Sequence, residues 1–164
     1  MKKKFISKRF AIASDGSAYP LKEKVKAFFL KEGYEVVDVG TVDPKNALPY
    51  YEAGKALAKA VAGGDFEYGI GFCGSGMGIN LALNKCPGIY AALCESIYTA
   101  KLSRVINNAN VLVMGGNIVS EHIAIEMAKT FIATEFLEGS DEEEFLTSAV
   151  KELDSWQIGW KIKD

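Results

Sequence analysis

The sequence predicts an α/β fold in which helices cover both faces of a doubly wound, five-stranded parallel sheet. Short apolar runs alternate with amphipathic stretches through most of the 164 residues. The runs are apolar throughout, as expected of strands that are buried on both faces. Alternation of strand and helix implies right-handed crossovers, which place helices on both sides of the sheet. The expected architecture is therefore a Rossmann-like three-layer sandwich.

Each predicted strand is followed by a predicted helix. The strands are expected at residues 10–14, 35–39, 68–72, 89–93 and 111–114, and the helices at 21–30, 50–61, 77–83, 97–105 and 121–136. In the first four helices, apolar residues recur at spacings of three and four. In the first of them Val25 and Phe29 fall together, whereas Lys22 and Lys24 are expected mostly on other faces.

The chain is expected to form one domain over residues 1–139, followed by a C-terminal helix and tail over 140–164. Ser140 and Glu143 have the spacing of a capping box, which would start this helix. The apolar side of the helix and the tail is formed by Phe145, Val150, Leu153, Trp156 and Trp160. Exposed apolar rings usually pack on another surface. We therefore expect this segment to pack on a neighbouring subunit.

Composition argues against several classes of function. The net charge is −2 and the basic residues are scattered, except at the N-terminus, so the charge does not favour nucleic acid. Lysines 2–4 resemble the start of a signal peptide, but Lys8 and Arg9 interrupt the apolar stretch that follows, so neither export nor a membrane span is expected. Three cysteines without metal-ligand spacing favour free thiols in a reducing, cytoplasmic setting, with no disulfide framework and no structural zinc.

Chemically capable residues follow two of the predicted strands. The first strand runs into Asp15, Gly16 and Ser17, and the third runs into Cys73 and the glycine-rich residues 74–78. Open parallel sheets bind their ligands outside the carboxyl ends of the strands, where the strand order reverses. Asp15 and Cys73 are therefore candidate neighbours in one cleft.

The glycines beside Cys73 suggest an anion-binding loop. Gly74, Gly76 and Gly78 allow a ligand to approach the main-chain N–H groups closely. If a helix begins near Met77, its free N–H groups and its dipole favour negative charge beside the sulfur, and hence the thiolate. Such a thiolate could attack a carbonyl carbon, or remove a proton from carbon while the loop holds the resulting enediolate.

Two other interpretations of this stretch remain open. Cysteine is among the most frequently buried residues, so Cys73 could be a packing residue, as we expect for Cys86 and Cys94. Residues 69–74 also match the G-x-G-x-x-G dinucleotide pattern, and Glu95 lies at about the right distance beyond them. That pattern needs its first two glycines in the turn after a strand, whereas here they fall inside the predicted strand.

The order of these motifs resembles the family of ribose-5-phosphate isomerase B and galactose-6-phosphate isomerase. The matching segments are Asp15; Cys73-Gly74-Ser75-Gly76-Met77-Gly78; Asn84-Lys85 with Pro87-Gly88-Ile89; Leu102-Ser103-Arg104; and Asn107-Asn108-Ala109-Asn110-Val111. They cover about residues 10–139. The resemblance implies a metal-independent aldose–ketose isomerase without a cofactor, which forms a homodimer or homotetramer with its active sites between subunits.

The resemblance also implies roles for the matched residues. Cys73 would be the base that moves a proton between C1 and C2 through an enediolate, and Ser75 would position and activate it. Asp15 would contact the sugar hydroxyls or the ring oxygen. The N–H groups of the glycine-rich loop would hold the oxyanion. The substrate-binding residues would be Gly16, Ser17, Gly74, Gly76, Met77, Gly78 and, from a neighbouring subunit, Asn107.

Several positions depart from the family pattern. The ribose-phosphate isomerases carry histidines, one of them linked to opening the sugar ring, where this chain has Gly16 and Ile106. Arginines that usually bind phosphate are replaced by Asn117 and by the acidic segment from Ser140 to Glu144. Guanidinium groups bind phosphate in bidentate fashion, whereas carboxylates repel it. The substrate is therefore not expected to be ribose 5-phosphate.

Three functions fit this pattern, and we favour the first. It is an isomerase for a small open-chain sugar such as a tetrose 4-phosphate, for an unphosphorylated sugar, or for one whose anionic group is held by Lys22, Lys101 or Arg104. The second is a subunit that needs a paralogous chain to supply histidine and arginines, since the only histidine, His122, is expected to be an exposed surface residue. The third is a catalytically silent sugar-binding protein, which the retained Cys73 loop disfavours.

Overall fold

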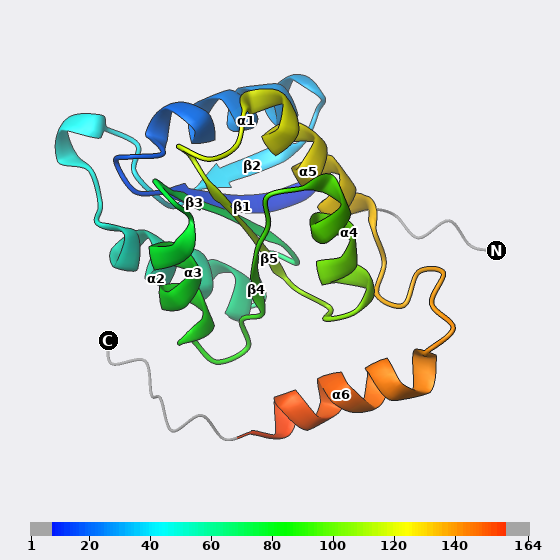
Figure 1. Cartoon of the computed structure of the whole chain (residues 1–164). Helices are drawn as coiled ribbons and strands as arrows, with labels where there is room; N and C mark the ends of the chain where they lie inside the picture. Colours follow the sequence, from blue (N-terminus) through cyan, green and yellow to red (C-terminus); the bar gives the residue numbers. More distant parts are fainter. Residues whose placement is uncertain (1–7, 157–164) are drawn as a thin grey trace.

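A five-stranded parallel sheet forms the centre of the molecule, as the sequence predicts (Figure 1). The computed structural model describes residues 8–156. The strands are β1 (Arg9–Ser14), β2 (Glu35–Asp38), β3 (Gly69–Cys73), β4 (Ala91–Leu93) and β5 (Val111–Gly115). They lie in the order β2-β1-β3-β5-β4. Every strand begins and ends within two residues of its predicted bounds.

Helices cover both faces of this sheet (Figure 1). They are α1 (Tyr19–Lys31), α2 (Tyr50–Ala62), α3 (Met77–Asn84), α4 (Ile97–Val105), α5 (Glu121–Ala133) and α6 (Glu143–Ser155), with a short 3-10 helix, η1 (Pro44–Asn46), before α2. α1, α4 and α5 pack on one face, and α2 and α3 pack on the other. α5 ends earlier than predicted, because Thr134 adopts an extended conformation.

The strands point their side chains alternately to the two faces and form two cores. The core toward α1, α4 and α5 has large residues from the strands: Phe10, Ile12, Ile70, Phe72, Leu112 and Met114. On the other face, a Cβ atom on Gly69 or Gly71 would lie 3.1 or 3.3 Å from the Leu57 side chain of α2. These two glycines therefore let α2 approach β3 closely. Because they lie inside β3, this packing accounts for the apparent dinucleotide pattern.

The strand order reverses between β1 and β3. From β1 the chain passes through α1 to β2 at the edge of the sheet, and then returns through α2 to β3 on the other side of β1. The helices that follow β1 and β3, namely α1 and α3, consequently lie on opposite faces. The loops that begin these two helices diverge, and a reversal of this kind is where open α/β sheets bind ligands.

Lys22 lies on the buried face of α1 together with Val25 and Phe29, so the expectation that it falls on another face is wrong. Its side chain is fully buried, and its Nζ donates hydrogen bonds to Asp38 Oδ2 and to the Thr41 carbonyl. Lys26 Nζ donates to the same carboxyl oxygen at 2.9 Å. Burial alone would raise the pKa of Asp38, but the hydrogen bonds from the two lysines outweigh burial and lower that pKa below its usual value. The apolar lysine stem can be buried because the charge is paired.

We expect Asp38→Asn to lower the free energy of unfolding, by an amount that shrinks in acid. The folded protein favours the ionised carboxylate, so the stabilisation is complete above the usual pKa of 3.8 and is lost as the pH falls toward the lower native value. Urea denaturation of wild type and variant from about pH 7 to about pH 3 measures the difference. A difference that stays constant over this range would contradict the lowered pKa.

α6 begins later than the sequence suggests. Glu142 is its N-cap residue, and no side chain caps the helix. The Ser140 hydroxyl accepts a hydrogen bond from the Glu142 N–H at 3.1 Å and so forms a turn before the helix. The predicted capping box between Ser140 and Glu143 is therefore wrong. Within the chain, Leu146 is the residue through which α6 is buried.

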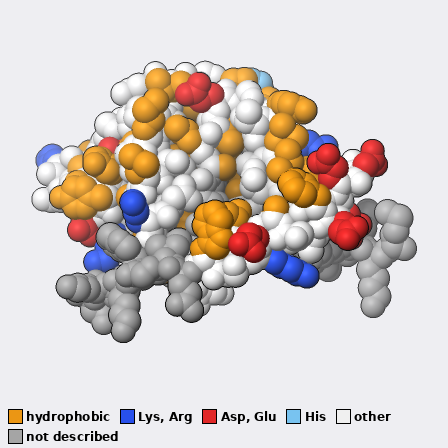
Figure 2. All heavy atoms as spheres, turned by 60° about the horizontal axis from the view of Figure 1, so that its bottom comes forward, with side chains coloured by type: hydrophobic (Ala, Val, Ile, Leu, Met, Phe, Trp, Pro, Cys, Tyr) orange, Lys and Arg blue, Asp and Glu red, His pale blue; other side chains and the backbone are white. Residues whose placement is uncertain are grey.

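The apolar side of α6 is exposed in the single chain. Phe145, Leu153 and Trp156 are 68%, 37% and 60% exposed. Figure 2 views the molecule from the side that is at the bottom of Figure 1, and hydrophobic side chains are spread over much of this face. Packing of this segment on a neighbouring subunit stays a prediction, and Trp160 lies outside the described residues.

The described part of the chain bears on several other expectations. None of its helices is long and apolar enough to cross a membrane. No group of three or more His, Cys, Asp or Glu side chains within it could hold a metal ion. Cys86 and Cys94 are free and buried, as predicted for packing residues. His122 is exposed in the first turn of α5, also as predicted.

Candidate active site

Loops from β1, β3 and β5 meet at the carboxyl edge of the sheet. Cys73 is the last residue of β3 and is 4% exposed. Its carbonyl accepts a hydrogen bond from the Gly116 N–H at 2.9 Å, and the Gly74 carbonyl accepts one from the Asn117 N–H at 2.9 Å. On the other side of β3, the Asp15 N–H donates to the carbonyl of the residue before Cys73 at 3.3 Å. These bonds bring the Asp15 and Cys73 segments together, as the sequence predicts.

Gly76 turns the chain from β3 into α3. It has a φ of +78°, in the left-handed region that favours glycine. A Cβ atom here would also lie 2.5 Å from Leu93 Cδ1 and 3.0 Å from the Gly115 nitrogen. The turn therefore requires glycine. As a result α3 begins at Met77, within four residues of Cys73, where the helix N-terminus was expected.

The N–H groups of this loop are not equivalent. The Gly76 N–H donates to the carbonyl at the end of β3 at 3.2 Å, and the Met77 N–H donates to the Ser75 hydroxyl at 3.3 Å. The N–H groups of Gly74 and Gly78 have no hydrogen-bond partner among residues 8–156. Free N–H groups at a helix start bind anions. Of the four N–H groups to which the resemblance gives this role, two are thus free in the single chain and two are engaged within it.

Asp15 has one oxygen that is engaged and one that is not. Its Oδ1 accepts hydrogen bonds from the Ser17 N–H at 3.0 Å, the Ser17 hydroxyl at 2.7 Å and the Ala18 N–H at 3.1 Å. These bonds fix the turn that leads into α1. Its Oδ2 has no hydrogen-bond partner in the described part of the chain, and the residue is half-buried. Asp15 can therefore accept a hydrogen bond from a sugar hydroxyl.

Gly74 lies between two neutral polar side chains. A Cβ atom on Gly74 would be 3.1 Å from Ser17 Oγ and 3.2 Å from Asn117 Nδ2. The loops after β1, β3 and β5, at residues 15–18, 74–76 and 116–120, contain no lysine or arginine. Asn117 is thus a candidate for substrate contact that the predicted set omits. Its position directly after the fifth strand is the signal that could have identified it.

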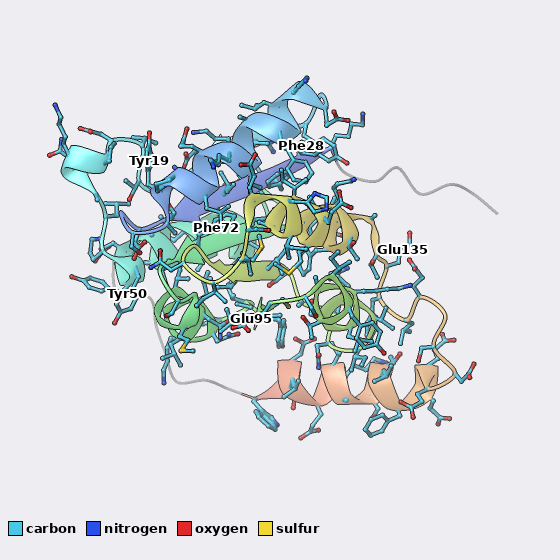
Figure 3. The ribbon with its side chains drawn as sticks, turned by 45° about the horizontal axis from the view of Figure 1, so that its top comes forward. Tyr19, Phe28, Tyr50, Phe72, Glu95 and Glu135 are labelled. Carbon is cyan, nitrogen blue, oxygen red and sulfur yellow. The ribbon has the colours of Figure 1, made fainter. Side chains whose placement is uncertain are left out.

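Another side of the candidate site is formed by the segment that leads from β2 into the first residue of α2. Ala47 Cβ lies 2.7 Å from the place of a Cβ atom on Gly16, and the Tyr50 ring lies 3.0 Å from the place of one on Gly78. Tyr50 is 45% exposed. Figure 3 shows it on the same side of the molecule as Tyr19, at the start of α1. The sequence argument missed Tyr50, because only the packing of α2 against α3 brings it to the site.

Asn107 lies at the opposite end of the sheet. It is an exposed residue of the turn between α4 and β5. Cys73, in contrast, pairs with Gly115, the last residue of β5. A strand of five residues spans about 13 Å. One chain therefore does not bring Asn107 to Cys73, so Asn107 can reach a substrate at Cys73 only from a second subunit.

The cations considered as anion ligands are engaged elsewhere. Lys22 is fully buried. Arg104 is 6% exposed, and its Nε donates to the Thr134 carbonyl at 3.3 Å. The expectation that either residue binds an anionic group of the substrate is therefore wrong. Lys101 forms an ion pair of 3.4 Å with Glu138.

Comparison with known proteins adds the family. The family model described as Ribose/Galactose Isomerase matches residues 10–147. The 4-deoxy-4-sulfo-D-erythrose isomerase of Clostridium sp. (strain MSTE9) is 45% identical over 144 residues, which cover 87% of this chain and 91% of that protein. The ribose-5-phosphate isomerase B of Escherichia coli (strain K12) is 35% identical over 137 residues, which cover 83% of this chain and 91% of that protein.

A solved structure agrees with these relatives. The crystal structure of a ribose 5-phosphate isomerase from Thermotoga maritima matches with a TM-score of 0.82 and 35% identity, and the match covers 90% of this chain and 98% of that one. The residues matched by the family model include the loops after β1, β3 and β5 that form the site. The chain belongs to the ribose/galactose isomerase family and is an aldose–ketose isomerase of a small sugar.

Proposed function

We propose that this chain interconverts 4-deoxy-4-sulfo-D-erythrose and the corresponding ketose, with Cys73 as the base. The observation that carries the proposal is the 45% identity to a relative named for this sugar. It is supported by Gly16 and Ile106, which stand where the resemblance implies histidines. The reaction moves one hydrogen from C2 to C1 and one from O2 to O1, so it needs no oxidant or reductant.

The geometry supports a role for each group in this transfer. The Cys73 thiolate removes the C2 proton of the aldose and returns it to C1. Meanwhile the N–H groups of Gly74 and Gly78 hold the negative oxygen of the enediolate, and such preorganised donors lower the barrier most where charge develops. The unpartnered Oδ2 of Asp15 accepts a hydrogen bond from a sugar hydroxyl. Asn107 binds the sugar from a second copy of the chain, because it lies at the far end of the sheet in its own chain.

The missing histidines fit a sugar that has no ring to open. A tetrose closes a five-membered ring through its 4-hydroxyl group. In 4-deoxy-4-sulfo-D-erythrose this hydroxyl is replaced by sulfonate, so the aldehyde cannot be captured in this way. An acid that opens the ring is then unnecessary. The absence of histidine at positions 16 and 106 therefore does not prevent the proposed reaction.

The missing arginines fit a sulfonate rather than a phosphate. A phosphate monoester carries a charge of about −1.5 to −2 at pH 7, whereas a sulfonate carries a single negative charge. Gly74 is flanked by two neutral side chains, Ser17 and Asn117. The Ser17 hydroxyl donates its proton to Asp15 Oδ1, so the Asn117 amide is the side-chain donor left for the substrate. A weakly basic monoanion can be bound by such a neutral donor. A doubly charged phosphate would be left without a counter-charge there.

The test is a comparison of substrates in heavy water. Purified chain is incubated with 4-deoxy-4-sulfo-D-erythrose, D-erythrose 4-phosphate and D-ribose 5-phosphate, and deuterium at C1 and C2 is followed by NMR. We expect kcat/KM for the sulfonate to exceed that for either phosphate by about tenfold or more, equivalent to about 1.4 kcal/mol. A preference for a phosphate would contradict the anion assignment. Turnover only after a related chain is added would instead support a paralogous partner.

A further inference from the structure

We propose that Lys22 is a positioning residue, which holds the segment 41–50 against the two glycine-containing loops of the active site. The inference rests on the proposed location of the active site at Cys73. Lys22 touches none of the site residues itself. It acts on them through Thr41, to which its Nζ donates a hydrogen bond at the main-chain carbonyl. The same Nζ is paired with Asp38 and lies 3.0 Å from Glu23 Oε1.

The ammonium group of Lys22 is buried, so water cannot replace its protein partners. The Lys22 side chain has no exposed surface, and the carboxyl group of Asp38 beside it is 9% exposed. A buried charge is tolerated only where its hydrogen bonds are satisfied by fixed partners. The Tyr19 ring also lies over the ammonium group, with its centroid 4.9 Å from Nζ. The position of the Thr41 carbonyl is therefore tied to α1 and to the end of β2.

Thr41 in turn holds both ends of the segment that follows it. Its N–H donates to the Ser14 carbonyl, directly before Asp15, at 2.9 Å. Its Oγ1 accepts a hydrogen bond from the Leu48 N–H at 3.0 Å and so closes the loop. Inside the loop, Asp43 Oδ1 accepts a hydrogen bond from the Lys45 N–H at 2.9 Å. The segment is thus a closed loop attached to the sheet at Thr41.

The far side of this loop contacts the site at two places. Ala47 packs on Gly16, in the turn after Asp15, and Tyr50 packs on Gly78, in the first turn of α3. The first contact limits where the turn carrying Asp15 can move. The second places an aromatic ring against Gly78 on the side where a Cβ atom would project. A shift of the loop would therefore move the wall at Ala47 directly and displace Tyr50 at the start of α2, which packing on α3 also holds.

Lys26 provides a matched control within the same ion-pair cluster. Its Nζ contacts Asp38 Oδ2 at 2.9 Å and Glu23 Oε1 at 2.7 Å, the two carboxylates that Lys22 also contacts. Of the two lysines, only Lys22 donates to the Thr41 carbonyl. Replacing Lys26 removes one cation from the cluster and leaves the loop attached. Replacing Lys22 removes a cation and the bond from α1 to the Thr41 carbonyl, and leaves the bond from the Thr41 N–H to the Ser14 carbonyl as the remaining attachment of Thr41 to the sheet.

Hydrogen exchange tests the attachment without any substrate. We expect the amides of residues 41–50 in Lys22→Met to exchange faster than in wild type by about tenfold or more, with the remaining sheet amides unchanged. Lys26→Met should leave the exchange of 41–50 within about twofold of wild type. Equal exchange in the two variants would overturn the attachment. Because this measurement involves no turnover, its failure is distinguishable from failure of the proposed function.

Kinetics then test the consequence for the reaction. In the folded Lys22→Met protein we expect KM for 4-deoxy-4-sulfo-D-erythrose to rise by about tenfold, more than kcat falls, because both walls of the site are displaced. Lys26→Met should keep both constants. A protein that is merely less stable would lose active molecules and so lower kcat at constant KM, and that result would overturn the proposal.

Thr41→Val supplies an independent variant in case Lys22→Met does not fold. Valine has the shape of threonine but cannot accept the hydrogen bond from the Leu48 N–H. Lys22 keeps all its partners in this variant. We expect faster exchange in 42–48 and a higher KM, in the same direction as for Lys22→Met. If hydrogen exchange and KM are both unchanged, fixing this loop at Thr41 does not affect the substrate site, and the proposal is overturned.

Discussion

Cys73→Ser is expected to lower kcat by about 10²- to 10⁴-fold, the range associated with loss of a general base. A serine hydroxyl has nearly the shape of the thiol but remains protonated at neutral pH, so it cannot take the C2 proton. Cys73 is 4% exposed at the end of β3, and the substitution preserves its hydrogen-bonding capacity. The measurement is deuterium incorporation during turnover, with circular dichroism to verify the fold.

Cys86→Ser is the matched control for this experiment. Cys86 is 7% exposed, and its Sγ lies 3.6 Å from the Ala82 carbonyl, to which a serine hydroxyl can also donate. Burial raises the pKa of Cys86, although the charge of Lys55 opposes this, so the thiol stays protonated and the thiolate that a base requires is not formed. We expect activity within about twofold of wild type. A fully active Cys73→Ser protein would disprove the assignment of the base, and equal losses in both variants would point to packing.

Asn117→Arg is expected to admit phosphorylated tetroses. Asn117 Nδ2 flanks Gly74, and the residue is exposed, so a longer side chain has room to extend over the site. A hydrogen bond to a charged group contributes about 1.5–3 kcal/mol, which corresponds to about tenfold or more in affinity. We therefore expect kcat/KM for D-erythrose 4-phosphate to rise by at least about tenfold relative to that for the sulfonate. The two substrates are measured in the same coupled assay.

Asn117→Gln separates charge from size in this experiment. Glutamine is longer than asparagine but neutral, so it should lengthen the side chain without creating a counter-charge for phosphate. We expect the ratio between the two substrates to stay within about threefold of wild type, less than 1 kcal/mol. If the arginine variant leaves the ratio unchanged, position 117 does not contact the anionic end of the substrate. A switch produced equally by glutamine would indicate that space, not charge, decides.

The sheet could be predicted because its signal is local. A strand that is buried on both faces must be apolar along its whole length, and each run of this kind became a strand. The pairing of Asp15 with Cys73 followed from the same pattern, since parallel strands carry their following loops to one edge. Asn117 obeys this rule after β5, but the sequence argument named it only as the replacement of a phosphate-binding arginine and not as a contact of its own.

Contacts made by three segments at once could not be read from the sequence. Lys22 lies on the same face of α1 as Val25 and Phe29, but its charge is paired by Asp38 at the end of β2 and by Thr41 beyond it, which the pattern of α1 does not reveal. The contact of Tyr50 with Gly78 depends on how α2 packs on α3. Each of these features arises from tertiary packing, which overrides the pattern of a single helix.

The space in this site exists because glycines stand where side chains would otherwise project. Around Gly74 the neighbours are Ser17 and Asn117, and against Gly78 lies the ring of Tyr50. A Cβ atom on Gly74 or Gly78 would lie 3.0–3.2 Å from these side chains, closer than Cβ atoms usually lie to a neighbour, so the facing side chain would have to move. We therefore expect the glycines of this loop to tolerate few substitutions. Specificity for new substrates would then change through the residues that face the loop. A directed-evolution library for altered sugars belongs at 17, 50 and 117 rather than in the loop that carries the thiol.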